Sequence, residues 1–387
     1  MKLLDVLVFI FLWIFANQHV SSGEETEPKQ LVIDNKYRNL QSIERNYRYV
    51  DNPVQILAIC CGGYFIHLPM FLFSLAKAYN FTSDIILNSN ATSTSYTEDF
   101  EQPLPFNLTF MMDDMCYRQI NGGENCIDKL RSVIPFHIIH HKNYFVKEYE
   151  KYHGTMGSRF NCAPYKMDVV RIAEFLHLNY LLVLDMDCLV YNKIDRMWLE
   201  ITQSGKDLSI PSRDVVKNEK TVFWAALEVS NVSASGLKTF PDAKNLWYIN
   251  RNKSHYYPPT GLNTGVMLYN LHLMRLRNIT IHEFVKDYNE SVQLADQDYL
   301  NSWAFYHPDA VGLLNCSYNV RSGINCLDHE IDGQTGQIVS EYDLFRVPEK
   351  SYILHGNNGY TRRGPGKALS HPFRVMFHQV CGFWTPL

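Results

Sequence analysis

An apolar run of strand length that ends in two carboxylates constrains this chain more than any other feature. Residues 181–184 lead directly into Asp185-Met186-Asp187. A buried strand that stops at such a pair places both acids at its carboxyl end, where open α/β sheets bind ligands. Two oxygen ligands at that position suit Mg²⁺ or Mn²⁺, and a bound cation can neutralise a diphosphate. The alternative is an ordinary polar turn after a strand, because the Asp-x-Asp pattern is common.

Strand-like and helix-like segments alternate along the chain around this run. Residues 54–61 form an apolar stretch of strand length, and residues 71–79 have helical character. From Lys166 onward, apolar residues recur at i, i+3, i+4 and i+7, which predicts a helix that leads into the strand before Asp185. A helix that feeds a strand in this way indicates an α/β fold with a mostly parallel sheet. Further short strands are predicted at 84–87, 106–111 and 136–140, and no regular element between 204 and 259.

The beginning of the chain has the pattern of a secretory signal. A basic residue is followed by an apolar run from residue 3 to residue 16, and small residues precede Gly23. The run is short for a membrane span, which needs about 20 residues. Residues 1–22 are therefore predicted to be a signal peptide, with a retained signal anchor as the alternative. Residues 23–52 are polar and are predicted to be a stem, and residues 53–387 a single catalytic domain.

Eight N-glycosylation triplets support a secretory route. Each triplet alone is weak evidence, but eight beside a signal-like start indicate a lumenal protein of the Golgi or endoplasmic reticulum, or a secreted protein. A membrane partner is expected only through an N-terminal anchor. The triplets begin at Asn80, Asn90, Asn107, Asn231, Asn252, Asn278, Asn289 and Asn315.

Nine cysteines in an oxidising compartment are expected to pair for the most part. Two local bridges are predicted, because a glycine-containing segment lies between the partners: Cys116 with Cys126, and Cys316 with Cys326. The remaining five are an odd number, so at least one of them is unpaired or bonds another chain. For those beside strands, simple core packing is the alternative. The five are Cys60, Cys61, Cys162, Cys188 and Cys381.

The composition is that of an ordinary globular domain. Hydrophobic residues make up 46% of the chain, which is enough for a large core, and the net charge is −4 at pH 7. A slightly acidic chain gives no reason to expect nucleic acid or an anionic membrane surface as a partner.

Three further motifs lie downstream of the two aspartates. Residues 261–265 form a polar, glycine-flanked turn that runs into an apolar strand, and glycines allow a ligand to approach the backbone closely. Asp296-Gln297-Asp298 stands where a helix is expected to begin, so the acids either cap that helix or serve a site. His355 ends a short strand before a glycine-rich loop. A histidine is often structural, but one that meets two aspartates suits Mn²⁺ far better than Ca²⁺.

In order and spacing, these motifs resemble glycosyltransferase family 8, and within it the glucoside xylosyltransferases. The resemblance covers roughly residues 54–375. The shared details are the ADQDYLN run at 295–301, the CSYNVR run at 316–321 and the ILHGN-x-G run that begins at Ile353.

The resemblance implies a GT-A fold, which is one Rossmann-like α/β domain that uses a UDP-sugar and Mn²⁺, with Mg²⁺ as the alternative ion. The implied metal ligands are Asp185, Asp187 and His355. The implied catalytic residues, which would face the anomeric carbon, are Asp296 and Gln297. The implied donor-binding residues are Cys60, Lys166, Asp185, Met186, Asn263, Gly265, Gly356 and Lys367. The implied acceptor-binding residues are Asp298 and Asn263. Lys166 departs from the family, which usually carries an Arg there, so the charge is kept but the planar fork is lost.

The implied activity is a retaining, metal-dependent transfer of a sugar, most specifically xylose from UDP-xylose, to a glucose or xylose end on a glycoprotein. UDP-glucose or UDP-galactose is the alternative donor. A secreted sugar-binding protein without turnover is a second alternative, which the intact acids and His355 oppose. A hydrolase with paired carboxylates is a third. Because the acids adjoin a metal-like site, transfer is the better prediction.

Overall fold

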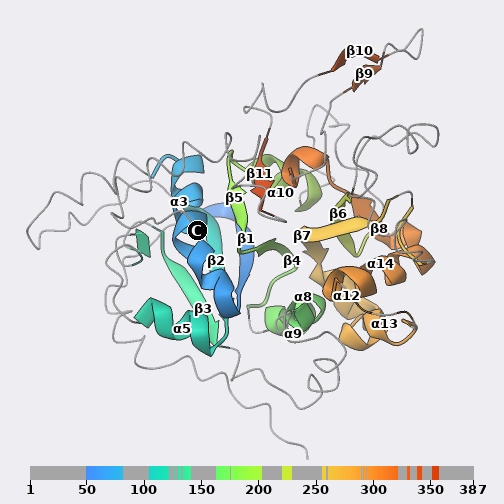
Figure 1. Ribbon diagram of the computed structural model, residues 1–387, viewed down its shortest axis with the longest axis horizontal. Helices are drawn as coiled ribbons and strands as arrows, with labels where there is room; N and C mark the ends of the chain where they lie inside the picture. The colour runs from blue at the N-terminus through green and yellow to red at the C-terminus, as the bar shows by residue number, and fades with distance from the viewer. Residues whose placement is uncertain are drawn as a thin grey trace, which may run out of the picture. The chain divides into compact units, whose positions relative to one another are not determined.

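The computed structural model describes part of the unit that runs from Glu44 to Leu387. Figure 1 shows the arrangement of the helices and strands in this unit. Within the described residues, no helix is both long and apolar enough to cross a membrane. The predicted signal segment, the stem up to residue 48 and the strand at 84–87 lie outside them. The described residues are 49–81, 104–121, 127, 130–131, 134–140, 163–174, 176–202, 220–228, 255–258, 260–288, 290, 292, 294–320, 329–331, 338–341 and 351–356.

A seven-stranded mixed sheet forms the centre of the fold. Four neighbouring pairs are parallel, and β7 is antiparallel to both of its neighbours. The predicted α/β fold with a mostly parallel sheet is therefore confirmed. The strands in spatial order are β3 (Phe136–His140), β2 (Leu104–Met112), β1 (Tyr49–Cys60), β4 (Tyr180–Asp185), β7 (Leu262–Asn270), β6 (Phe223–Leu227) and β8 (Val311–Leu313).

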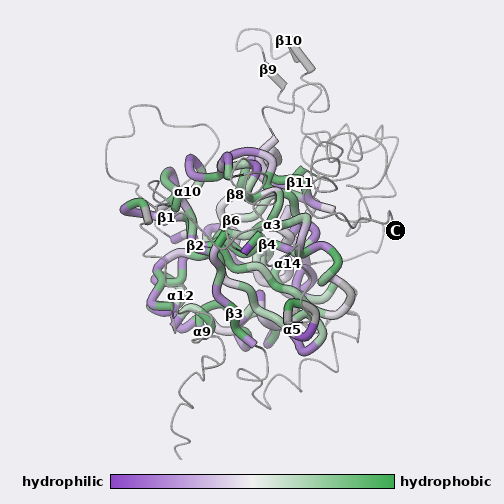
Figure 2. The backbone as a smooth tube through the Cα atoms, turned by 90° about the vertical axis from the view of Figure 1, so that its left-hand side faces the viewer, coloured by the Kyte–Doolittle hydropathy of each residue, from purple (hydrophilic) through white to green (hydrophobic). Residues whose placement is uncertain are grey.

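One face of the sheet packs against α3 (Leu68–Ala78) and α10 (Asp195–Thr202) in the main hydrophobic core. Alternate residues of the strands point to this face, including Ile56 and Leu184. Because the central strands are covered on both sides, they consist of nearly continuous apolar runs, as the hydropathy colouring in Figure 2 illustrates. Pro69 lies in the first turn of α3, a position where proline favours helix initiation.

Further helices surround the strands that carry the site residues. These are α8 (Ala163–Met167), α9 (Val169–Glu174), α12 (Leu271–Leu276), α13 (Ile281–Val285) and α14 (Asp296–Tyr306). Helices α12 and α14 contact strands β4 and β7, respectively, and α8, α9 and α13 pack against these two helices or against one another. The Tyr269 hydroxyl in β7 donates to the Lys166 carbonyl in α8 at 2.8 Å. The Asn301 side chain in α14 bonds both the N–H and the carbonyl of Leu262, at 2.6 and 2.9 Å. The Asn301 bonds fix the middle of α14 beside the amino end of β7, and the Tyr269 bond fixes α8 beside its carboxyl end.

Smaller elements complete the described part. β5 (Cys188–Val190) pairs antiparallel with β11 (Ile353–His355), and β9 (His329–Ile331) pairs with β10 (Ile338–Glu341). The remaining elements are η1 (Gly62–His67), α5 (Asp114–Asn121), η6 (Pro308–Ala310) and η7 (Cys316–Tyr318).

Three segment boundaries differ from those expected. β1 begins at Tyr49, because its first residue pairs with Leu104 of β2 before the apolar run starts. β6 lies inside the stretch where no element was predicted, since a five-residue strand is too short for periodicity to identify. The sequence 262–265, expected to be a turn, is the beginning of β7.

The predicted bridge between Cys116 and Cys126 is wrong, because Cys116 is bonded to Cys60. The parallel pairing of β1 with β2 places Cys60 opposite Met112, immediately before the helix that carries Cys116. Asp113 holds the same junction, since its carboxylate accepts from the N–H groups of Gly62 at 2.6 Å and Cys116 at 2.9 Å. Cys188 is buried and free, in agreement with the core-packing alternative. The proposed partner Cys326, with Cys162 and Cys381, lies outside the described residues.

Candidate active site

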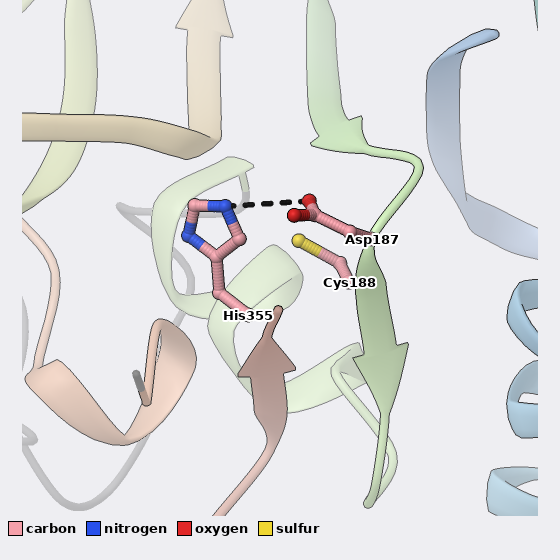
Figure 3. A group of neighbouring side chains, drawn as sticks. All are labelled: Asp187, Cys188 and His355. Carbon is pink, nitrogen blue, oxygen red and sulfur yellow. Dashed lines mark ion pairs between the residues drawn. The ribbon is translucent and has the colours of Figure 1, made fainter. Parts of the chain in front are cut away.

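The two aspartates lie at the carboxyl end of β4, as the sequence predicted. Asp185 is the last residue of that strand, and Asp187 immediately precedes β5. The antiparallel pairing of β5 with β11 sets Cys188 opposite His355, so the histidine reaches both acids. Its Nε2 lies 3.4 Å from Asp187 Oδ1 and 3.7 Å from Asp185 Oδ2. Figure 3 shows the imidazole of His355 facing Asp187, with the Cys188 thiol beside them. Asp187, Cys188 and His355 form a cluster whose ligand atoms lie within 4.8 Å of one another.

Gly265 is required for His355 to occupy this position. A Cβ atom built on Gly265 would collide with the imidazole ring. The β4–β7 register, which pairs Leu184 with Val266, brings the next residue Gly265 level with Asp185. The glycine therefore allows the β7 backbone to lie directly against the ring.

Lys166 connects the metal-ligand candidates to the first turn of α14. Its Nζ lies 2.5 Å from Asp185 Oδ1 and 3.4 Å from Asp296 Oδ2, and it donates to the Thr264 carbonyl at 3.2 Å. Burial acts against the charged form of Lys166, but the two carboxylates outweigh burial and raise its pKa above the usual value. The lysine is therefore a buried cation between two acids.

The two aspartates of the Asp-x-Asp pair have different environments. Burial raises the pKa of Asp185, in spite of the neighbouring Lys166. Burial also opposes ionisation of Asp187, but His355 outweighs it, so the pKa of Asp187 is lowered. Two adjacent acids that differ in this way are typical of functional sites.

The donor atoms and the charge at this site fit a divalent cation. Within the part of the chain that the structure describes, the carboxylates of Asp185, Asp187 and Asp296 surround one ammonium, that of Lys166. A cation between Asp187 and His355 would offset the excess negative charge, which is costly to bury without a partner. Two carboxylates with an imidazole suit a transition metal such as Mn²⁺ better than Ca²⁺, which takes oxygen ligands. The residues present therefore fit the expected ion.

A buried chain of amides extends from this cluster. Asn263 Nδ2 donates to Glu228 Oε2 and to Gln297 Oε1, both at 3.2 Å. Gln297 Nε2 donates to the same Glu228 oxygen at 3.0 Å. Asn263 Oδ1 accepts from Asn319 Nδ2 at 2.8 Å, and Asn319 Oδ1 lies 3.0 Å from His355 Nδ1. The chain therefore joins Gln297 to His355.

The start of α14 has an unusual backbone. Ala295, the residue before the helix, has φ 53° and ψ −117°, which a side chain with a Cβ rarely adopts. Asp298 Oδ2 accepts from the Leu294 N–H at 2.8 Å and closes this turn. Asp296 Oδ2 accepts from the Thr264 hydroxyl at 2.8 Å. Asp298 thus holds the turn before α14, and Asp296 contacts Thr264 and Lys166, while a catalytic role for either acid stays a prediction.

The structure brings most of the predicted site residues together. Those joined by the contacts above are Asp185, Asp187, His355, Lys166, Asn263, Gly265, Asp296 and Gln297. Gly356 donates its N–H to the Asp187 carbonyl at 2.8 Å. Met186 is buried, and Cys60 ends β1 in the disulfide with Cys116. The Asp298 carboxylate is engaged in its own turn. Lys367 lies outside the described residues.

Three residues of the site were not assigned a role from the sequence. Glu228 follows the short strand β6, in a stretch without periodicity. Thr264 and Asn319 stand inside motifs that were noted, but no spacing indicates that they contact Asp296 and His355. All three are buried polar residues in the structure, and such groups need hydrogen-bond partners, so burial and not local sequence marks them.

Comparison with known proteins identifies relatives of one kind among the curated matches. Human glucoside xylosyltransferase 1 (Homo sapiens) is 31% identical over 126 residues, which cover 29% of this chain and 26% of that protein. The rat protein of the same name (Rattus norvegicus) is 29% identical over 151 residues, covering 35% of this chain and 32% of that protein. The match thus spans about a quarter to a third of the length of these relatives. No family model matches the chain.

Solved structures with a similar arrangement are also glycosyltransferases by name. Mouse xyloside xylosyltransferase 1 has 17% identity and a TM-score of 0.43, covering 79% of this chain and 98% of that one. Galactosyltransferase LgtC, solved with donor and acceptor sugar analogues, has 14% identity and a TM-score of 0.44, covering 86% and 97%. The resemblance to glycosyltransferase family 8 that the motifs predicted is confirmed by the curated relatives: the chain is similar in sequence to the glucoside xylosyltransferases.

Proposed function

We propose that this protein is a metal-dependent glycosyltransferase with a GT-A fold that retains the anomeric configuration and uses a UDP-sugar as donor. The observation that carries the proposal is the convergence of Asp185, Asp187 and His355, from β4, the turn before β5 and β11, on one point. The intact Asp185, Asp187 and His355 argue against a sugar-binding protein that has lost turnover. A hydrolase with paired carboxylates is disfavoured because Asp185 and Asp296 are both occupied by Lys166.

The cation, Mn²⁺ or alternatively Mg²⁺, would offset the charge that develops on the departing UDP. The residues of the chain have the remaining tasks. Lys166 keeps Asp185 and Asp296 at a fixed separation, and the Gln297 amide is held by Glu228 and Asn263. Oriented amide dipoles and carboxylates at this place can stabilise the positive charge of an oxocarbenium-like transition state without reorganising.

The metal requirement is tested by measuring UDP release with purified protein. We expect activity with Mn²⁺, loss of activity with a chelator, and almost no turnover for Asp187→Ala. The matched control is Glu283→Ala, an exposed carboxylate paired with Lys286 on α13, which should keep full activity. Full activity of Asp187→Ala in metal-free buffer would contradict the proposal.

The donor that we propose is UDP-xylose, and the acceptor is a glucose or xylose end on a glycoprotein. Similarity to the glucoside xylosyltransferases supports this choice. A site closed against the hydroxymethyl group of glucose would discriminate by a steric clash, which separates donors more sharply than a missing contact. A higher kcat/KM with UDP-glucose or UDP-galactose than with UDP-xylose would contradict the choice of donor. It would not contradict the proposed metal site.

Retention is proposed to proceed by front-face attack, in which the acceptor hydroxyl enters on the side from which UDP departs and a phosphate oxygen takes its proton. A double displacement would need a carboxylate nucleophile, for which Asp296 and Asp298 are candidates. Asp296 Oδ2 is engaged by Thr264 and Lys166, which favours a stabilising role for this acid. Proton NMR of the first product is expected to show an α-linked sugar. A covalent sugar found on Asp296 or Asp298 by mass spectrometry would replace front-face attack with double displacement.

The proposed setting is the lumen of the secretory pathway or the extracellular space. The eight N-glycosylation triplets and the signal-like start of the sequence support it. Expression of the full chain in cultured cells, followed by treatment with a glycosidase that removes N-glycans, should lower its apparent mass. An unchanged mass would contradict this setting.

A further inference from the structure

Asn319 stands at the centre of the buried amide chain, although neither the metal-ligand set nor the proposed catalytic residues include it. It is fully buried, and its neighbours Asn263 and His355 are 2% and 4% exposed. Water is therefore a poor substitute for any partner in this chain, and each polar atom must find its complement within the protein.

Donor and acceptor can be assigned at each bond of the amide chain, because the chain begins at a backbone N–H, which can only donate. The Gly265 N–H donates to Asn263 Oδ1 at 3.0 Å, and a backbone N–H has no alternative role. This bond identifies the atom as the amide oxygen. The Asn263 nitrogen then lies on the other side, where Glu228 Oε2 and Gln297 Oε1 accept from it.

The orientation of the Asn263 amide determines that of Asn319. Because Asn263 Oδ1 is an acceptor, the atom of Asn319 that lies 2.8 Å from it must be the donor Nδ2. The Asn319 oxygen consequently faces His355 Nδ1 at 3.0 Å. An amide oxygen can only accept, so Nδ1 must carry a proton, and in the neutral imidazole that binds a cation the lone pair then lies on Nε2.

Two backbone bonds hold the asparagine and the histidine in register. The His355 N–H donates to the Val320 carbonyl at 2.8 Å, and the Val320 N–H donates to the Ile353 carbonyl at 2.9 Å. Val320, the residue after Asn319, is thus bonded to both the first and the last residue of β11. Because the side chains stay aligned, the Nε2 lone pair is aimed at Asp187 and Asp185.

The geometry points to Asn319 as a positioning residue that fixes the Nδ1–H tautomer of His355 and so presents Nε2 to a divalent cation. This inference rests on the proposed function, since it concerns the same metal site. A histidine ligand is commonly oriented through its second nitrogen, and loss of such a partner costs about 10–100-fold in metal affinity. In this protein the Gly265 N–H orients the Asn263 amide, the Asn263 amide orients that of Asn319, and the Asn319 oxygen orients the His355 ring.

The first test reads the tautomer directly in the metal-free wild-type protein. Long-range ¹H–¹⁵N correlation on protein with ¹⁵N-labelled histidine, at about pH 8 where histidine is ordinarily neutral, should give the Nδ1–H pattern for His355. The His355 signal is assigned as the one missing from the spectrum of His355→Gln. An Nε2–H pattern would overturn the inference, whatever the metal affinity.

The second test measures Mn²⁺ affinity by titration calorimetry on folded variants. Asn319→Leu, which removes the acceptor, should weaken binding about 10–100-fold. Asn319→Asp keeps an oxygen toward Nδ1 and should restore the tautomer, but it loses the donor to Asn263 Oδ1 and should therefore restore only part of the affinity. Ser351→Ala is the matched control, a buried polar residue two positions before β11 that takes no part in the amide chain. Equal affinity of Asn319→Leu and wild type would overturn the inference. A wild type that binds no Mn²⁺ would overturn the metal proposal instead, and the tautomer measurement would still decide the role of Asn319.

Discussion

Lys166, which is buried, and Asp185, which is partly buried, form an ion pair at the carboxyl end of β4, with Nζ 2.5 Å from Oδ1. The same ammonium lies 3.4 Å from Asp296, so one cation serves an acid from the metal-ligand set and an acid from the start of α14. This arrangement separates the two oxygens of Asp185. One is held by the lysine, and the other faces His355.

Removal of the lysine charge should therefore destabilise the fold as well as the site. Lys166→Met leaves the buried Asp296 and the partly buried Asp185 without their shared cation. Breaking a fully buried pair costs about 3–5 kcal/mol, and the loss here should be smaller because Asp185 remains partly exposed to solvent. Lys166→Arg keeps the charge and should cost less. The measurement is urea unfolding followed by circular dichroism. Lys286→Met is the control, because Lys286 pairs with Glu283 on the surface and its loss should leave the midpoint unchanged. Equal midpoints for Lys166→Met and wild type would contradict this account.

Gly265→Ala should remove metal binding, because the added methyl group would occupy the place of the His355 ring. Gly312→Ala offers a matched comparison, since a Cβ at that position collides with the buried Trp224 instead. Both substitutions overpack the interior and should cost about 1–3 kcal/mol of stability. Only Gly265→Ala should lower Mn²⁺ affinity. If both variants bind the ion equally well, His355 is not a ligand.

Mn²⁺ should raise the Tm of the wild-type protein, because a ligand bound only by the folded state adds to its stability. At a free concentration of one hundred times Kd, the gain is about 2.7 kcal/mol. His355→Gln should lose most of this shift, and Ca²⁺ should give a smaller one than Mn²⁺, since it prefers oxygen ligands. Differential scanning fluorimetry is sufficient for the comparison. An unchanged Mn²⁺ shift in His355→Gln would show that the ion binds elsewhere.

Ala295→Gly should be unusually well tolerated, because glycine accepts the backbone angles that strain Ala295. Such strain is of the order of 1–3 kcal/mol. Ala304→Gly is the internal reference, since Ala304 is buried to the same extent inside α14 and a glycine there costs about 1 kcal/mol in propensity alone. We expect the second variant to be the less stable by about 2 kcal/mol. Equal unfolding free energies would show that Ala295 is not strained.

Local pattern was sufficient for the elements that carry the predicted acids. The apolar run before Asp185, the acidic start of α14 and the short strand before His355 were each expected where the structure has them. In each case a few neighbouring residues determine the element, through burial on both faces or through the charge at a helix start.

Features that depend on distant segments were beyond local pattern. The Cys60–Cys116 bridge follows from the parallel pairing of β1 with β2, which no spacing of cysteines reveals. Residues 262–265 resemble a turn because glycine and asparagine are rare in strands, yet they begin β7 because Leu262 and Asn263 pair with Leu227 and Ala226 of β6. Glu228 and Asn319 acquire their partners only when β6, β7 and β11 come together.

The pairing of β5 with β11 also bears on the order in which the molecule is built. Asp185 and Asp187 are synthesised well before His355, because β6, β7 and α14 lie between them in the chain. The N-terminal part of a chain is the first to be synthesised, and closing so long a segment costs conformational entropy. A nascent chain that has folded β1, β2 and β4 would therefore present the acids without their imidazole. The ability to hold a cation would then arise late, when β11 docks, so an interrupted chain could acquire much of the sheet and still lack the site.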